Sequence, residues 1–161
     1  MREAHYLLSS EKIKAEAARL GFSACGMAKA GPVEQSHAVF YADWVACGCH
    51  ADMSYMERNV EKRIDPTLLV EGCRTIVSVA LNYYPATFIP KDQPQISWYA
   101  YGKDYHDVMR MKLHELYESI AAIHPDIKIS GRWFCDTAPI LERYWAWQCG
   151  LGWLGRNNQL I

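Results

Sequence analysis

The sequence lacks several features that assign a chain quickly to a class. None of its six cysteines belongs to a C-x-x-C pair, and the only close pair, Cys47 and Cys49, has a single residue between its members. Zinc and disulfide frameworks depend on such spacings, so we expect neither here and predict reduced thiols in a cytoplasmic setting. No charged-then-apolar leader opens the sequence, and no apolar run approaches the ~18 residues of a membrane span, so we expect no membrane association.

An excess of charge of one sign is also absent. The 17 basic and 18 acidic side chains are interspersed and leave a net charge of −1. Phosphate-backbone binding needs a basic surface, so attraction to a nucleic acid has to come largely from outside these residues. A chain of 161 residues with 50% hydrophobic content is long enough for one globular domain, and we predict a single domain over residues 1–161.

Helical and strand-like patterns alternate along the chain. Apolar residues at helical spacing predict helices over 10–20, 34–47, 104–122 and 139–149, with Gly21 ending the first and Asp104 capping the third. A nearly continuous apolar run predicts a central strand over 74–83. We expect further strands over 22–27 and 127–135 and an extended segment over 96–101, and three prolines predict a surface loop over 85–95. The order predicts an α/β (α+β) fold in which helices cover a sheet.

The most informative stretch is R-W-F-C-D-T-A-P-I-L-E, residues 132–142. A strand-like run leads to Asp136, and Pro139 stops the strand there, so the carboxyl group is predicted at the end of an element, where clefts form. Asp136 is therefore a candidate proton donor. The alternative is that Asp136 or Thr137 only caps the helix that follows Pro139.

A second dense segment is Y-A-Y-G-K-D-Y-H, residues 99–106. Three phenols, a glycine, two charges and an imidazole precede a helix, which is the mixture of flat apolar faces and polar groups that a large planar cofactor needs. An aromatic surface strand followed by a capped helix explains the segment equally well. His106 alone is more typical of a helix surface than of a ligand.

Two weaker motifs remain. G-L-G-W-L-G at residues 150–155 allows close backbone approach to a ligand, but it follows a helix and lacks a downstream acid, so it is not a dinucleotide fingerprint and a plain turn is the simpler interpretation. In E-K-R-I-D-P, residues 61–66, Arg63 has a fork suited to planar oxygens, although such charge runs usually face solvent.

In their order, E-K-R-I-D-P, Y-A-Y-G-K-D-Y-H, F-C-D-T-A-P-I-L-E and G-L-G-W-L-G-R-N resemble the N-terminal catalytic domain of epoxyqueuosine reductases. That family completes queuosine biosynthesis in tRNA and depends on cobalamin. The resemblance runs from about residue 10 to the end of the chain. It implies a three-layer sheet covered by helices, as in nitroreductase-like and cobalamin-processing proteins.

The resemblance also implies roles for particular residues. Asp136 corresponds to the proton donor of the family, and an ordinary aspartate, which titrates near ~3.9, needs burial or a nearby negative group to hold a proton at neutral pH. No histidine is implied as a cobalt ligand, so base-off cobalamin is expected, and no residue is assigned to a metal. The residues expected to line the corrin or substrate site are Arg63, Ser97, Tyr99, Tyr101, Gly102, Lys103, Asp104, Tyr105, Trp153 and Gly155.

The family carries two iron–sulfur clusters of the [4Fe–4S] type and much of its tRNA-binding surface in a further C-terminal part, and neither is in these residues. We therefore expect a truncated domain of a monomeric oxidoreductase, inactive alone because nothing relays electrons to cobalt. Alternatives are a corrinoid-binding or trafficking module without tRNA chemistry, a flavin-dependent nitroreductase-like reductase, and a domain that only scaffolds a partner.

Overall fold

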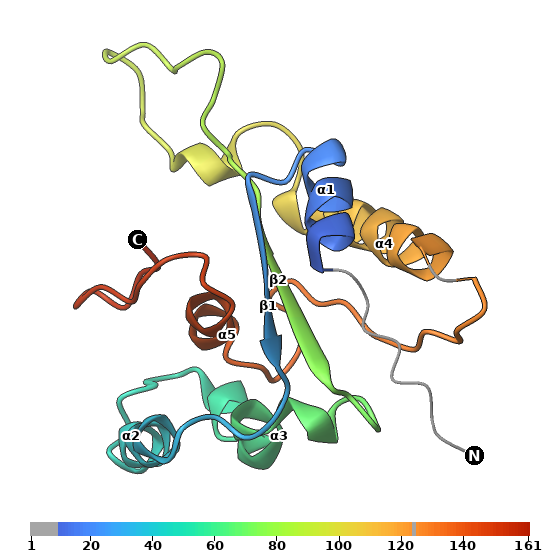
Figure 1. Cartoon of the computed structure of the whole chain (residues 1–161). Helices are drawn as coiled ribbons and strands as arrows, with labels where there is room; N and C mark the ends of the chain where they lie inside the picture. Colours follow the sequence, from blue (N-terminus) through green and yellow to red (C-terminus); the bar gives the residue numbers. More distant parts are fainter. Residues whose placement is uncertain (1–9, 124) are drawn as a thin grey trace, which may run out of the picture. The chain divides into compact units, whose positions relative to one another are not determined.

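The computed structural model describes residues 10–123 and 125–161 of the chain (Figure 1). Five helices, two strands and three single 3₁₀ turns make up its regular structure within those residues. In chain order they are α1 (Ser10–Arg19), β1 (Ala24–Lys29), α2 (Gln35–Ala46), η1 (Ser54–Met56), α3 (Val60–Ile64), η2 (Pro66–Leu68), β2 (Thr75–Ala80), η3 (Trp98–Ala100), α4 (Tyr105–Ile123) and α5 (Glu142–Gln148).

The chain divides into two compact units. Unit 1 comprises Met1–Cys25 and Val79–Asp136, and unit 2 comprises Gly26–Ser78 and Thr137–Ile161. Each unit is thus assembled from two separate stretches of chain. Because the structure divides into two units, the single catalytic domain expected over residues 1–161 stays a prediction.

Strands β1 and β2 pair with each other in a two-stranded sheet. Ser23 N donates to Ala80 O at 2.8 Å and Ala30 N donates to Arg74 O at 3.0 Å, so residue numbers rise along one strand as they fall along the other and the pair is antiparallel. The expected strands over 22–27 and 74–83 are confirmed in position. The fold is mixed α/β, but the sheet of the described residues has only these two strands.

The core of unit 1 forms where α1 packs beside α4 (Figure 1). Ala17, Phe22 and Leu116 are its buried residues. The end of α1 prepares this packing: Gly21 has φ +84°, Gly21 N donates to Ala18 O, and Phe22 N donates to Ala17 O. This is the Schellman arrangement, in which a glycine turns the chain and brings the next apolar residue back onto the helix. The predicted helix end at Gly21 is confirmed.

The core of unit 2 is built around α5. Its buried residues are Val33, Tyr144 and Trp145. The Tyr144 hydroxyl accepts a hydrogen bond from Glu34 N at 3.0 Å, which joins α5 to the start of α2. A side chain at Gly26 would overlap the Cys149 carbonyl, so β1 can approach the end of α5 closely only because position 26 is glycine.

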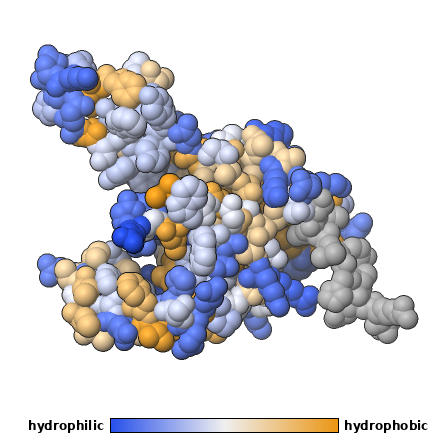
Figure 2. Space-filling model, turned by 60° about the vertical axis from the view of Figure 1, so that its left-hand side comes forward, coloured by the Kyte–Doolittle hydropathy of each residue, from blue (hydrophilic) through white to orange (hydrophobic). Residues whose placement is uncertain are grey.

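The predicted surface loop over residues 85–95 is confirmed, and exposed aromatic residues lie in it and on both sides of it. Tyr84, Phe88 and Trp98 contact each other edge to face, with ring centroids 5.3 to 5.5 Å apart. Figure 2 shows hydrophobic surface in patches between hydrophilic residues on the face that it presents. The expected extended segment over 96–101 is wrong in part, because residues 98–100 form η3.

The strand predicted over residues 127–135 is also wrong. Residues 128–135 are irregular, and no strand of the described residues pairs with them. They are held by α4 side chains instead: the Tyr117 hydroxyl donates to Ile129 O at 3.1 Å, and the Trp133 ring lies 5.2 Å from His114 and 5.1 Å from Tyr117. The strand-like run of residues favoured a strand, but its Trp133 ring packs on helix α4 instead of in a sheet.

None of the helices among the described residues combines the length and the apolar character that a membrane crossing requires.

Candidate functional site

Asp136 is not the helix cap that one interpretation of the sequence required. Helix α5 begins at Glu142, and its N-cap residue is Leu141, which makes no side-chain capping bond. Capping by Asp136 or Thr137 is therefore wrong. Asp136 has φ +57°, a left-handed conformation that Asp and Asn adopt more readily than most other residues.

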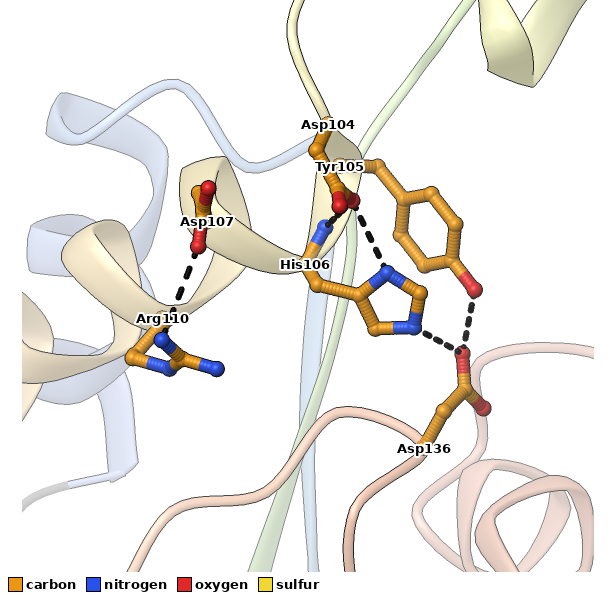
Figure 3. Close-up of polar contacts among 6 residues, drawn as sticks. All are labelled: Asp104, Tyr105, His106, Asp107, Arg110 and Asp136. Atoms are coloured by element: carbon orange, nitrogen blue, oxygen red, sulfur yellow. Dashed lines mark hydrogen bonds and ion pairs between the residues drawn. The ribbon is translucent and has the colours of Figure 1, made fainter.

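The Asp136 carboxyl group is held by Tyr105, the first residue of α4. The Tyr105 hydroxyl donates a hydrogen bond to Asp136 Oδ2 at 2.7 Å (Figure 3). This bond raises the pKa of Tyr105 well above its ordinary value, with smaller contributions from burial and from the neighbouring negative charge. The Asp136 side chain is 55% exposed, so a ligand can reach it, but the described residues do not supply the burial expected of a carboxyl group that holds a proton at neutral pH.

His106 stands between two carboxyl groups. Its Nδ1 lies 2.8 Å from Asp104 Oδ1, and its Nε2 lies 3.7 Å from Asp136 Oδ2. The imidazole also stacks on the Tyr105 ring, with centroids 4.0 Å apart and planes 30° apart. Figure 3 shows both rings directed toward Asp136 from the first turn of α4. Two hydrogen bonds, the 3.7 Å contact and the ring stacking together join the four side chains into one polar network.

Asp104 has a second role as the cap of α4. Its Oδ1 accepts a hydrogen bond from His106 N at 2.9 Å, which confirms the predicted cap. That backbone bond, followed by the His106 side chain, lowers the pKa of Asp104 below its ordinary value. His106 was not among the site residues predicted from the sequence, and the signal that could have found it is the Asp-x-His spacing: a capping aspartate faces the side chain two residues on.

The other predicted site residues of unit 1 lie just before α4. The Tyr99 ring meets the Tyr105 ring edge to face at 5.9 Å, and the Tyr101 hydroxyl accepts a hydrogen bond from Ile89 N at 3.4 Å. Gly102 has φ +77° with open space where a side chain would be. Ser97, at the start of η3, makes no side-chain capping bond, and Lys103 is exposed. Tyr99 thus belongs with the Asp136 network through Tyr105.

Three predicted site residues belong to unit 2. Arg63 lies on α3 and donates from Nη2 to Tyr55 O at 3.0 Å. Trp153 and Gly155 lie on a terminal hairpin in which Trp153 and Ile161 exchange two backbone hydrogen bonds of 2.9 Å. The glycine-rich segment therefore leads from the end of α5 into the first arm of this hairpin, and the Trp153 side chain is exposed. A ligand role for these three stays a prediction.

Within the described residues, no group of three or more His, Cys, Asp or Glu side chains is arranged to hold a metal ion. The polar network of unit 1 is instead suited to binding and moving protons, because it combines two carboxyl groups, an imidazole and a phenol.

A family model of known proteins matches the part of the sequence that contains this network. The family model "Epoxyqueuosine reductase QueG, DUF1730" matches residues 63–137, which include Tyr105, His106 and Asp136. An epoxyqueuosine reductase from Cellulophaga algicola is 42% identical over 152 residues, which cover 94% of this chain and 49% of that protein. The chain spans about half the length of the curated relatives it matches.

Solved structures agree. The crystal structure of an epoxyqueuosine reductase with an epoxyqueuosine-modified tRNA-Tyr stem loop matches with a TM-score of 0.78 and 27% identity, over 93% of this chain and 40% of that one. An epoxyqueuosine reductase from Bacillus subtilis, whose aspartate catalytic loop is swung out of the active site, matches with a TM-score of 0.73 and 27% identity, over 94% and 40% of the two chains.

Proposed function

Because this chain is homologous to the N-terminal portion of epoxyqueuosine reductases, we propose that it forms the active-site half of an enzyme that reduces epoxyqueuosine to queuosine in tRNA. The observation that carries the proposal is 42% identity over 94% of the chain. The relative crystallised with a modified tRNA stem loop supports the choice of substrate.

Asp136 is the proposed proton donor. Turning an epoxide into an alkene takes two electrons and a proton for the departing oxygen, since an alkoxide is a poor leaving group. The carboxyl group is half-exposed, and its Oδ2 is held by Tyr105. The relative with an aspartate catalytic loop supports an acid of this type on a loop rather than on a helix or strand.

Cobalamin is the proposed cofactor, and the residues present fit it. Tyr99 exposes half of its surface beside Tyr105, and Gly102 leaves open space at the same segment, so flat apolar faces stand next to polar groups. Cobalamin, when bound, supplies low-valent cobalt as the source of electrons. Base-off cobalamin without a histidine ligand is part of the proposal, and His106, which contacts a carboxyl group on each side, is not offered as a ligand.

The residues proposed to hold the cofactor or substrate come from both units. Those of unit 1 line the segment before α4, and those of unit 2 offer a guanidinium fork, an exposed indole and a glycine. They are Ser97, Tyr99, Tyr101, Gly102, Lys103, Asp104 and Tyr105 in unit 1, and Arg63, Trp153 and Gly155 in unit 2.

The remaining parts of the proposal concern the whole enzyme. The chain spans about half the length of its relatives. We propose that two [4Fe–4S] clusters and most of the tRNA contacts belong to the other half, so the chain alone should not turn over. We also propose one monomeric catalytic domain of nitroreductase-like, three-layer type. The cytoplasmic setting expected from the cysteines stays a prediction.

Cofactor binding tests the proposal directly. The purified chain is titrated with cobalamin and with flavin mononucleotide and followed by absorbance, using Tyr99→Ala and the control Tyr83→Ala, which removes a similarly exposed ring outside the proposed site. We expect cobalamin binding that Tyr99→Ala weakens and Tyr83→Ala does not. Flavin binding alone would favour a flavin-dependent reductase. If neither cofactor binds, the result would favour a domain that only scaffolds a partner.

Turnover separates the enzyme from a trafficking module. The intact protein, meaning the whole enzyme of which this chain is proposed to form the active-site half, is given epoxyqueuosine-containing tRNA, cobalamin and a low-potential reductant. The nucleosides are then analysed by mass spectrometry. Queuosine formation that requires cobalamin is the expected result. Bound cobalamin without any conversion would favour the trafficking module instead.

A further inference from the structure

The contacts around Asp136 imply roles for its neighbours as well as for Asp136 itself. We infer that Asp104, Tyr105 and His106 are positioning residues that hold the Asp136 carboxyl group and return a proton to it after each transfer. This inference rests on the proposed function, because it concerns the proton that Asp136 is proposed to donate. It is carried by three contacts within unit 1: Asp104 to His106, His106 to Asp136, and Tyr105 to Asp136.

Asp104 determines which nitrogen of His106 carries the fixed proton. An ionised carboxylate only accepts hydrogen bonds, and Asp104 Oδ1 already accepts one from His106 N. The 2.8 Å contact therefore requires a proton on His106 Nδ1. Nε2 is left as the nitrogen that gains and loses a proton, and Nε2 is the one that lies toward Asp136.

Tyr105 holds the carboxyl group without giving up its own proton. Its hydroxyl donates to the same oxygen, Oδ2, that lies nearest His106, and its ring stacks on the imidazole. Because the pKa of Tyr105 is raised, the phenol stays protonated at neutral pH and acts as a fixed donor. Tyr105 thus orients both the carboxyl group and the imidazole.

The proton balance closes within these groups. The Asp136 carboxyl group gives its proton to the departing oxygen and becomes a carboxylate. Imidazolium Nε2–H of His106 then gives a proton to Asp136 Oδ2 and becomes a neutral imidazole that keeps Nδ1–H on Asp104. Solvent restores the proton at Nε2, since the His106 side chain is 36% exposed.

Two geometric conditions bear on this transfer. The gap of 3.7 Å between Nε2 and Oδ2 has to close to about 2.8 Å, which half-exposed side chains can do by rotation. The charged and titratable groups in contact with His106 within unit 1 include Asp104, Asp136 and Tyr105. Arg110 acts electrostatically on Asp104, while Tyr99 and Cys135 act on Tyr105.

The first test reads the tautomer of His106 in this chain by ¹⁵N NMR at a pH where the ring is neutral. Free imidazole side chains favour Nε2–H, so a dominant Nδ1–H form is a specific expectation. Asp104→Asn should shift the ring back toward Nε2–H, while the signals of His114, on the same helix, stay unchanged. A dominant Nε2–H form in the unmodified chain would overturn the inference.

The second test uses turnover by the intact protein. His106→Gln should lower kcat by about 10²-fold, the lower end of a general acid–base contribution, with little change in KM. Added imidazole should restore part of the rate because the ring position is accessible. Tyr105→Phe should lower kcat without rescue by imidazole. The matched controls are His37→Gln and Tyr83→Phe, which alter the same residue types outside the contacts around Asp136.

The outcomes separate the two proposals. If the unmodified protein converts tRNA and the His106→Gln variant has an unchanged kcat, the proposed return of a proton through His106 is overturned. The enzyme assignment is then left intact. If the protein shows the Nδ1–H tautomer but converts no tRNA, the proposed function is overturned. The proposed proton return to Asp136 during that reaction is then overturned with it.

Discussion

The starts of α4 and α5 make an instructive pair. Each helix follows a segment that contains an aspartate, but only Asp104 caps its helix, through His106 N at 2.9 Å. Helix α5 begins at Glu142 after an uncapped Leu141, well past Asp136. Seven-residue α5 is held instead by burial of Tyr144 and Trp145. A helix start can therefore be stabilised by a local cap or by tertiary packing. Because α5 is stabilised by packing, Asp136 is not needed as its cap and contacts Tyr105 instead.

The largest effect should separate the two aspartates by activity. Asp136→Asn in the intact protein should lower the single-turnover rate on tRNA by about 10²- to 10⁴-fold, the usual contribution of a general acid. Asn tolerates the φ of +57°, so the unfolding free energy should change by less than about 0.5 kcal/mol. Asp107→Asn, which alters an exposed pair with Arg110, is the control. Normal turnover by Asp136→Asn would remove it from its proposed role.

Packing at α5 comes next. Trp145→Ala should lower the unfolding free energy by about 3–5 kcal/mol, measured by urea denaturation, because a large buried ring is removed from the core of unit 2. Trp145→Phe is the matched control and should cost less, since the buried indole N–H has no hydrogen-bond acceptor among the described residues. Equal losses in the two variants would contradict packing as the force that holds α5.

The interior of α4 should respond in the same way as α5. Leu116→Ala should cost about 2–5 kcal/mol of unfolding free energy, because Leu116 is buried against Ala17 and Phe22. Met111→Ala, on the same helix but 58% exposed, should change it by less than about 0.5 kcal/mol. A small loss for Leu116→Ala would mean that α4 depends on its cap more than on its packing.

The smallest effect should be that of the cap itself. Asp104→Ala should lower the thermal unfolding midpoint at neutral pH by less than either core truncation. The folded state lowers the pKa of Asp104 from its ordinary 3.8, so its contribution is present above that value and disappears as the pH falls through the folded-state pKa. The two midpoints should therefore converge in acid. A difference that persists there would assign the effect to something other than the ionised cap.

The same contrast explains which predictions were right. The end of α1 at Gly21 and the cap of α4 at Asp104 were confirmed, because both depend on neighbours within a few residues. The strand over residues 127–135 was wrong, because those residues pack on Tyr117 and His114 of α4, far away in sequence. His106 was taken for a surface residue, since nothing near it in the sequence revealed Asp136, 30 positions along, as its neighbour.

The amino-acid sequence by itself determined the helices with strong caps and stops, the strand within residues 74–83 and the resemblance to epoxyqueuosine reductases, since these depend on local stereochemistry and on motif order. The role of Asp136 as an acid stays a proposal. Tertiary structure decided that Asp136 is no cap and that Tyr105 and His106 stand around it. Side chains so distant along the chain meet only when α4 and the segment before Asp136 pack together, and no local pattern encodes that contact.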